Sequence, residues 1–203
     1  MDLKQKLRPI KYKIDSWKFV LQRTLFSWFY QIKLPINNRI KVDRHVKFGR
    51  GVRVYSYGGF MEVKENVTIC NYSKFIVGDG RLYIGKNCLL GEYGIYNTFA
   101  DLIIGDDVIT ADRVSFVTNI HKYEDIHIPI KDQPSISEEI VIGDGSWLGM
   151  NVTVLAGSHI GKNCVIAAHS VVKGDYPDFC VIGGVPSRIL KRYNEKTGKW
   201  EKA

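Results

Sequence analysis

The sequence predicts an all-β chain that coils into a parallel β-helix of triangular cross-section, and three observations support this fold class. A large apolar residue returns at every sixth position over one long stretch, at Ile142, Leu148, Val154, Ile160, Ile166 and Val172. Small side chains dominate four residues later, at Ser146, Val152, Ser158, Cys164 and Ser170, before Tyr176 ends the series. Glycine and asparagine recur between them, where corners need backbone conformations that β-branched residues resist. Short strands repeated in this way build a solenoid, in which each coil buries its apolar residues against its neighbours.

An antiparallel sandwich is the alternative for a regular β sequence. It predicts strands of about five or six residues with turn clusters about every 8 to 12 residues. The period of six is instead kept without a slip from Ile142 to Val172. The handedness of the β-helix does not follow from this spacing.

The same hexapeptide frame recurs upstream, where the spacing between successive coils is less regular. It places three inward residues in each coil, at Val42, Phe48 and Val54, then Val63, Ile69 and Phe75, then Ile84, Leu90 and Tyr96, then Ile104, Thr110 and Phe116. These triplets begin 21, 21 and 20 residues apart, but the next one begins 38 residues later, at Ile142, and the last 18 residues after that. Since 18 residues make three hexapeptides, the long step contains an inserted loop at about residues 117–139, which we expect to protrude from the β-helix.

The chain divides into three parts, which are residues 1–41, 42–192 and 193–203. Of the 29 Lys and Arg residues, 14 fall in residues 1–53 against three Asp, so the basic charge belongs to the N-terminal quarter. Residues 12–34 predict an amphipathic helix that Pro35 ends, with an aromatic, apolar face and a basic reverse. Two interpretations stay open, a cap on the end of the β-helix and peripheral contact with an anionic membrane. Residues 193–203 are predicted to form a short polar tail or cap.

Several function classes are disfavoured by composition. The basic residues precede the repeats and lie on an aromatic helix, which is not typical of a nucleic-acid-binding module. Four scattered cysteines, Cys70, Cys88, Cys164 and Cys180, match neither a disulfide scaffold nor a zinc motif, so we expect no metal. Without an early apolar run or a span of about 20 apolar residues, we expect a cytoplasmic protein, or one peripheral at the inner membrane face.

The stretch "IVIGDGSWLGMNVTVLAGSHIGKNCVIAAHSVVKGDYPDFCVIGGVPSRILKR" resembles the C-terminal half of sugar O-acetyltransferases of the hexapeptide-repeat acyltransferase family. The segments "GSWLG", "AAHSVV" and "GGVPSRIL" carry this resemblance, which is closest to the galactoside and maltose acetyltransferase branch and covers about residues 42–192. It implies a left-handed parallel β-helix, acetyl-CoA as the acetyl donor and a homotrimer.

The resemblance also implies a role for the inserted loop. His121 occupies the position of the family's catalytic histidine, and an imidazole is suited to take a proton from a sugar hydroxyl near neutral pH. His127 is the rival candidate, and a solvated loop histidine is the alternative without function. Asn119 stands where many of the family have a second histidine. Asn119, Tyr123, Glu124 and Asp125 are candidates to contact the substrate, and the two acids could instead orient the imidazole.

The donor site follows from the same resemblance. It places coenzyme A against Met150, Ala168, Lys173, Arg188 and Lys191, where the three cations would bind phosphates. Ordinary coil packing for the first two residues and a basic surface for the cations are the alternatives. No glycine-rich phosphate loop is present, because these glycines keep the hexapeptide phase.

These expectations favour an acetyl-CoA-dependent O-acetyltransferase that acts on a sugar of a capsule, O-antigen or exopolysaccharide or on its lipid-linked precursor. An amino-sugar N-acetyltransferase or an antibiotic acetyltransferase on the same fold is the second hypothesis. The third is a non-catalytic β-helix or a relative of carbonic anhydrase, although no histidine triplet lies in phase to bind zinc.

Overall fold

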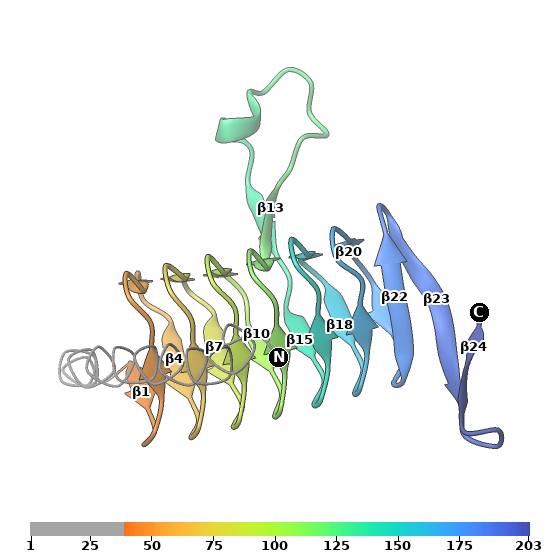
Figure 1. Cartoon of the computed structure of the whole chain (residues 1–203). Coiled ribbons are helices and arrows are strands. Elements are labelled where there is room, and N and C mark those ends of the chain that lie inside the picture. The colour runs from red at the N-terminus through yellow and green to blue at the C-terminus, as the bar shows by residue number, and fades with distance from the viewer. Residues whose placement is uncertain (1–38) are drawn as a thin grey trace, which may run out of the picture.

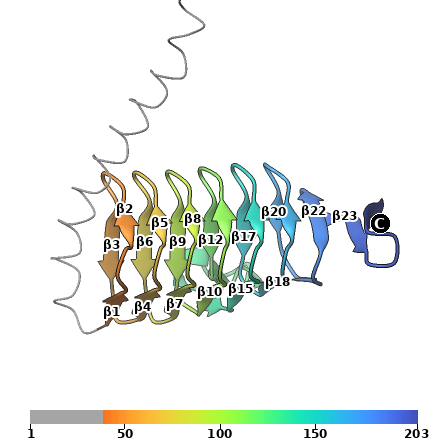
Figure 2. The ribbon, with the colours of Figure 1, turned by 60° about the horizontal axis from the view of Figure 1, so that its bottom comes forward.

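Residues 39–203, which the computed structural model describes, form a parallel β-helix that runs from β1 at one end to the C-terminus at the other (Figure 1). Three sheets of seven, nine and six strands line its sides, and Figure 2 shows them as rows along the prism. The all-β fold class is therefore confirmed. The helix predicted at residues 12–34 lies outside the described residues.

The chain visits the three sheets in turn, so each coil adds one strand to each of them. The first sheet contains β1 (Ile40–Val42), β4 (Phe60–Val63), β7 (Arg81–Ile84), β10 (Leu102–Ile104), β15 (Ile140–Ile142), β18 (Ser158–Ile160) and β21 (Asp175–Tyr176). The second contains β2 (Lys47–Phe48), β5 (Thr68–Ile69), β8 (Leu89–Leu90), β11 (Ile109–Thr110), β16 (Trp147–Leu148), β19 (Val165–Ile166), β22 (Cys180–Gly184), β23 (Ser187–Asn194) and β24 (Lys199–Lys202). The third contains β3 (Arg53–Ser56), β6 (Lys74–Val77), β9 (Ile95–Thr98), β12 (Ser115–Val117), β17 (Thr153–Leu155) and β20 (Val171–Val172).

The hexapeptide frame matches the core residue by residue. Every large apolar position from Ile142 to Val172 is at most 2% exposed, and the small positions from Ser146 to Ser170 are fully buried. Upstream, the rings of Phe75, Tyr96 and Phe116 stack along the axis, with centroids 4.5 and 5.3 Å apart. Side chains of successive coils thus stack in columns that fill the prism. The outward-facing side chains are therefore available for functions other than core packing.

The corners carry residues in the left-handed backbone conformation. Asn66, Asn87 and Asn163 have φ between 51° and 61°, as the recurrence of asparagine predicts. Tyr72 and Tyr93 adopt it as well, which the sequence pattern did not predict. Their rings stack at 5.1 Å, so contact between successive coils offsets the backbone cost at this corner.

The C-terminal end is closed by antiparallel strands. β22 pairs with β23, and β23 pairs with β24, so residues 193–203 complete a hairpin at the end of the second sheet. Among residues 39–203 we find no helix with the length and apolar character of a membrane span.

Candidate active site

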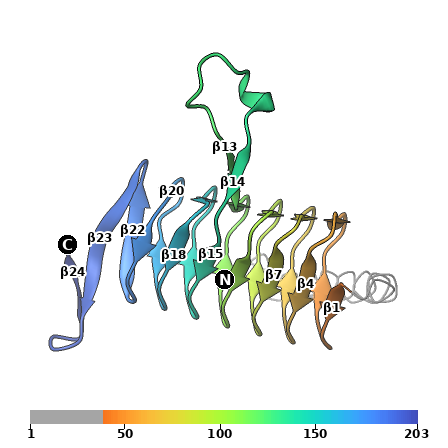
Figure 3. The same cartoon turned by 180° about the vertical axis from the view of Figure 1, so that it is seen from behind.

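The insertion forms an arm, residues 118–139, which stands out from the side of the β-helix (Figures 1 and 3). β13 (Asn119–His121) pairs antiparallel with β14 (Ser135–Ser137), and a 3-10 helix at Ile130–Asp132 lies near the tip. The arm leaves at the corner between the third and first sheets, which other coils cross in two or three residues, as at residues 156–157. The expected protruding loop is thus present, and its base is an ordered two-stranded ribbon.

Thr118 fixes the outgoing strand of the arm. Its buried Oγ1 accepts hydrogen bonds from the backbone N–H groups of Phe99 (2.8 Å) and Ala100 (3.1 Å), and it donates to the carbonyl of Asn97 (3.0 Å). The carbonyl of Thr118 accepts from the Glu138 N–H at 2.9 Å, which joins the two strands at their root. Nothing in the hexapeptide frame predicts this role for Thr118, because the contacts connect different coils.

Glu139 and His159 hold the returning strand. The Gly157 N–H donates to the carbonyl of Glu139 at 3.1 Å. The His159 imidazole lies between two carboxylates, with Nδ1 2.7 Å from Asp175 Oδ1 and Nε2 3.4 Å from Glu139 Oε1. Both strands of the arm are therefore attached to the body by specific contacts.

His121 is exposed at the outer end of β13. Asn119 lies two residues earlier on the same strand, so both side chains point to one face of the ribbon. The Oδ1 atoms of Asn119 and Asn97 are buried, and neither has a hydrogen-bond partner within residues 39–203. Asn97 is paired with Val117 on the third sheet, beside the root of the arm. One unused hydrogen-bond acceptor thus lies on the strand that carries His121, and another lies beside the root of the arm. Asn97 could have been suspected as the polar residue between Ile76 and Val117 in a row of otherwise apolar side chains.

The other candidate substrate residues lie beyond His121, toward the tip. Tyr123 is 70% exposed. The Glu124 carboxylate accepts from the Tyr123 N–H at 3.0 Å, and the Asp125 carboxylate accepts from the His127 N–H at 2.9 Å. Both acids thus serve the local turn.

Gln133 organises the tip from its centre. Its amide nitrogen donates to the carbonyls of Asp125 and Ile128, both at 2.8 Å, and its side chain is buried among otherwise exposed residues. Apolar side chains are exposed around it, with Ile126 at 87% and Ile130 at 56%. The tip is therefore internally ordered and yet presents apolar surface.

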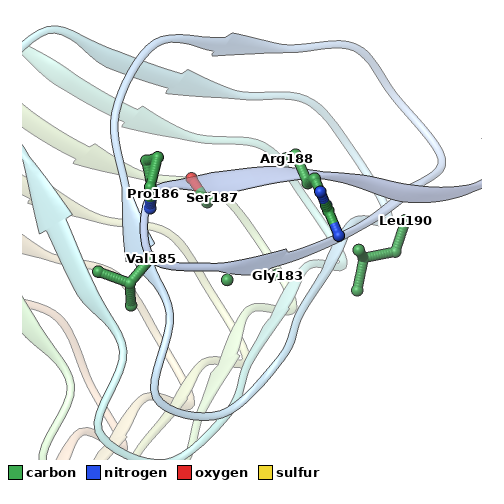
Figure 4. A pocket seen from close by; sticks show the side chains of 7 residues that line it. Gly183, Val185, Pro186, Ser187, Arg188 and Leu190 are labelled. Atoms are coloured by element: carbon green, nitrogen blue, oxygen red, sulfur yellow. The ribbon is translucent and has the colours of Figure 1, made fainter.

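Met150 and Ala168 lie one above the other at the corner between the second and third sheets. The His169 N–H donates to the Met150 carbonyl at 2.9 Å, and in the next coil the Gly184 N–H donates to Ser170 Oγ at 3.1 Å. This column leads to a hollow of about 550 Å³ between β22 and β23. Figure 4 shows its lining, which is Gly183, Gly184, Val185, Pro186, Ser187, Arg188 and Leu190.

The three predicted cations gather at the same end. Tyr176 Oη lies 3.3 Å from the carbonyl of Lys173 and 2.6 Å from Ser187 Oγ, which brings Lys173 close to the start of β23. Arg188 lines the hollow, and Lys191 follows on β23. Met150, Ala168 and the β22–β23 hairpin with Arg188 and Lys191 are called the donor corner. Lys173 lies outside it, at the corner between the third and first sheets, in the same last coils.

The arm and the donor corner are separate within one chain. Within the described part of the chain, no hydrogen bond, ion pair or ring contact joins His121 to the five donor residues. The arm leaves from a different corner than the one that carries Met150 and Ala168, whereas Lys173 lies at the arm's own corner, two coils further on.

The described part of the chain contains no cluster of side chains typical of a metal-binding site. Within residues 39–203, no three His, Cys, Asp or Glu side chains come together in a group that could hold a metal ion. Burial raises the pKa of the Cys88 and Cys164 thiols to about 11, which disfavours the thiolate form.

Comparisons with known proteins agree with this architecture. The family model "Bacterial transferase hexapeptide (six repeats)" matches residues 139–174. WbbJ of Escherichia coli, named for O-acetyl transfer in lipopolysaccharide biosynthesis, is 37% identical over 62% of this chain and 68% of its own. The acetyltransferase YvoF of Bacillus subtilis is 30% identical over 80% of this chain and 98% of its own. An acetyltransferase of Mycobacterium tuberculosis is 31% identical over 88% of this chain, which spans only 62% of that relative's length.

The solved structures support the fold alone. The N-acyltransferase AntD from Bacillus cereus has a TM-score of 0.70 at 18% identity, covering 83% of this chain and 91% of that one. The fold, the matched repeats and the similarity to WbbJ and YvoF lead to one conclusion: the chain belongs to the bacterial hexapeptide-repeat transferase family.

Proposed function

We propose that the protein is an acetyl-CoA-dependent O-acetyltransferase that acts on a sugar hydroxyl in the biosynthesis of a surface polysaccharide. The observation that carries this proposal is His121, an exposed imidazole at the end of an anchored ribbon. WbbJ supports the polysaccharide setting. The galactoside O-acetyltransferase of Escherichia coli, 33% identical over 68% of this chain and 66% of its own, supports a sugar as acceptor.

His121 would act as the general base. Acetyl-CoA supplies the acetyl group as a thioester. His121 takes the proton of the acceptor hydroxyl as the hydroxyl oxygen bonds to the thioester carbonyl carbon, and it returns this proton to the sulfur as the carbon–sulfur bond breaks.

The donor corner fits coenzyme A. Arg188 lines the hollow together with Gly183 and Gly184, so a guanidinium is available there (Figure 4). Arg188, Lys173 and Lys191 would bind the phosphates, and Arg188 can do so with two parallel hydrogen bonds. Met150 and Ala168 would line the path of the pantetheine arm.

The complete site would lie between two copies of the chain in a homotrimer. The arm presents Tyr123, Ile126 and Ile130 to solvent in an isolated chain, and such apolar patches mark interaction surfaces. One chain would therefore supply His121 and its neighbour the donor corner. Sedimentation tests this proposal, because an active monomer would contradict it.

A separate proposal concerns residues 12–34, which we expect to bind an anionic membrane surface. The proposal comes from the basic and aromatic pattern of this segment. The full chain should pellet with anionic vesicles at low salt, and deletion of residues 1–34 should abolish pelleting. Equal pelleting of both proteins would contradict the proposal.

The activity is tested by incubating the protein with acetyl-CoA and a panel of free sugars, nucleotide sugars and polysaccharides, with released thiol as the readout. We expect thiol release that depends on a hydroxylated sugar and yields an alkali-labile ester. An alkali-stable amide on an amino sugar would indicate N-acetylation instead. If no acceptor releases thiol above the hydrolysis rate, the proposal is wrong.

A further inference from the structure

The two strands of the arm meet in a register that determines which side chains face one another. The Lys122 N–H donates to the Pro134 carbonyl at 3.0 Å, and the Glu138 N–H donates to the Thr118 carbonyl at 2.9 Å. Hydrogen-bonded and non-hydrogen-bonded pairs alternate in an antiparallel ribbon. The pair between His121 and Ser135 is therefore of the non-hydrogen-bonded kind, in which side chains lie closest.

Ser135 is thus the direct neighbour of the proposed base. Residues that are paired across a ribbon lie on the same face, with Cβ atoms about 4.5–5.5 Å apart. At that separation a serine hydroxyl can reach a nitrogen of the opposite imidazole ring. Asn119 and Ser137 form the next pair on this face, while Ile120 and Ile136 face the other way.

The two nearby acids are each engaged with the backbone of the tip in the described chain. Glu124 and Asp125 accept hydrogen bonds from backbone N–H groups of the tip. Ser135 is exposed, and its side chain makes no hydrogen bond to any of residues 39–203. Its hydroxyl is therefore available to His121.

We infer that Ser135 is a positioning residue for His121. This inference rests on the proposed function, in which His121 is the base. A neutral imidazole has one N–H and one free nitrogen, and the partner of the N–H determines which nitrogen is free. Ser135 Oγ accepts the hydrogen bond from the ring N–H, so the other nitrogen is held ready to take the proton of the acceptor hydroxyl.

The test compares Ser135→Ala with Ser135→Thr and with the matched control Ser137→Ala, which changes the same ribbon face beside Asn119. Because one neutral hydrogen bond is lost, we expect Ser135→Ala to lower kcat about 3- to 10-fold, with KM for acetyl-CoA unchanged. Ser135→Thr keeps the hydroxyl and should retain most of the activity. Ser137→Ala should leave kcat within about 2-fold of the unchanged protein.

A second readout reports the imidazole directly. Nitrogen-15 chemical shifts of His121 distinguish the two neutral tautomers, and we expect one to dominate in the unchanged protein and in Ser135→Thr. Ser135→Ala should shift the population toward a mixture. Unchanged kcat together with unchanged tautomer populations in Ser135→Ala would overturn the inference.

This readout also separates the inference from the proposed function. The tautomer population can be measured without turnover, so a shift in Ser135→Ala supports positioning even if no acceptor is acetylated. If His121→Ala is inactive while Ser135→Ala matches the unchanged protein in both readouts, the base assignment stands and the inference about Ser135 is wrong.

Discussion

Burial determines the chemistry of the cysteine side chains. Cys164 occupies one of the small inward positions of the frame, which Ser146, Ser158 and Ser170 fill in other coils. Loss of solvation raises the pKa of its thiol to about 11 in the folded protein, because the charged form is disfavoured inside the prism. In the unfolded chain the pKa of a cysteine thiol is about 8.5.

The sign of the resulting pH dependence follows from this difference. The stabilising contribution of the neutral thiol is fully present below the unfolded pKa and is lost as pH rises toward about 11. We therefore expect Cys164→Ser to lose less stability than the unchanged protein between pH 8 and pH 10.5. Urea midpoints at both pH values measure this, and an equal loss in both proteins would contradict it.

The same burial should protect Cys88 and Cys164 from thiol reagents at pH 8 until the protein unfolds. The half-buried Cys70 is the internal comparison and should react first.

At the scale of elements, the outgoing strand of the arm is anchored by the buried hydroxyl of Thr118 at its root. Thr118→Val would leave the N–H groups of Phe99 and Ala100 without their acceptor while keeping the shape of the side chain. Unsatisfied buried donors cost about 1–3 kcal/mol, so we expect a loss of stability of this size. We also expect faster hydrogen exchange at Ile120 and Ile136, since the ribbon is fixed from this root.

Thr118→Ser is the matched control, because it keeps the hydroxyl and loses only a methyl group. It should retain most of the stability and the slow exchange of the ribbon. Slow exchange in Thr118→Val would show that the arm is held without this anchor.

The frame made the strands and the position of the arm predictable, because side-chain size at every sixth residue decides which positions face inward. The contacts that shape the site were not predictable in this way. Thr118, Gln133, Asn97 and the facing of His121 by Ser135 all depend on which coils or strands become neighbours. Such pairings arise from the register of the completed coils. The spacing of residues within one segment does not predict this register.

At the scale of the whole molecule, the proposed site needs parts of two chains. His121→Ala removes the base from the arm, and Arg188→Ala removes a phosphate partner from the donor corner. We expect each variant to be strongly impaired alone. After unfolding, mixing in equal amounts and refolding, about a quarter of the sites in a cyclic trimer should combine an intact arm with an intact corner.

Activity should therefore reappear in the mixture and reach about a quarter of the unchanged level. Refolding each variant separately and then combining the two is the control. If the mixture is no more active than this control, arm and corner do not form a shared site.

The central claim is that His121 is the general base, and replacing this residue tests the claim most directly. Loss of a positioned general base lowers kcat by about 10²- to 10⁴-fold, so we expect His121→Ala to fall in this range. Acetyl-CoA affinity and the assembly should be nearly unchanged, because the arm lies outside the core of the prism. His127→Ala, in the same arm, should lose much less. The measurement is kcat for both variants with the best acceptor of the panel. Activity retained in His121→Ala and lost in His127→Ala, or retained in both, would contradict the account.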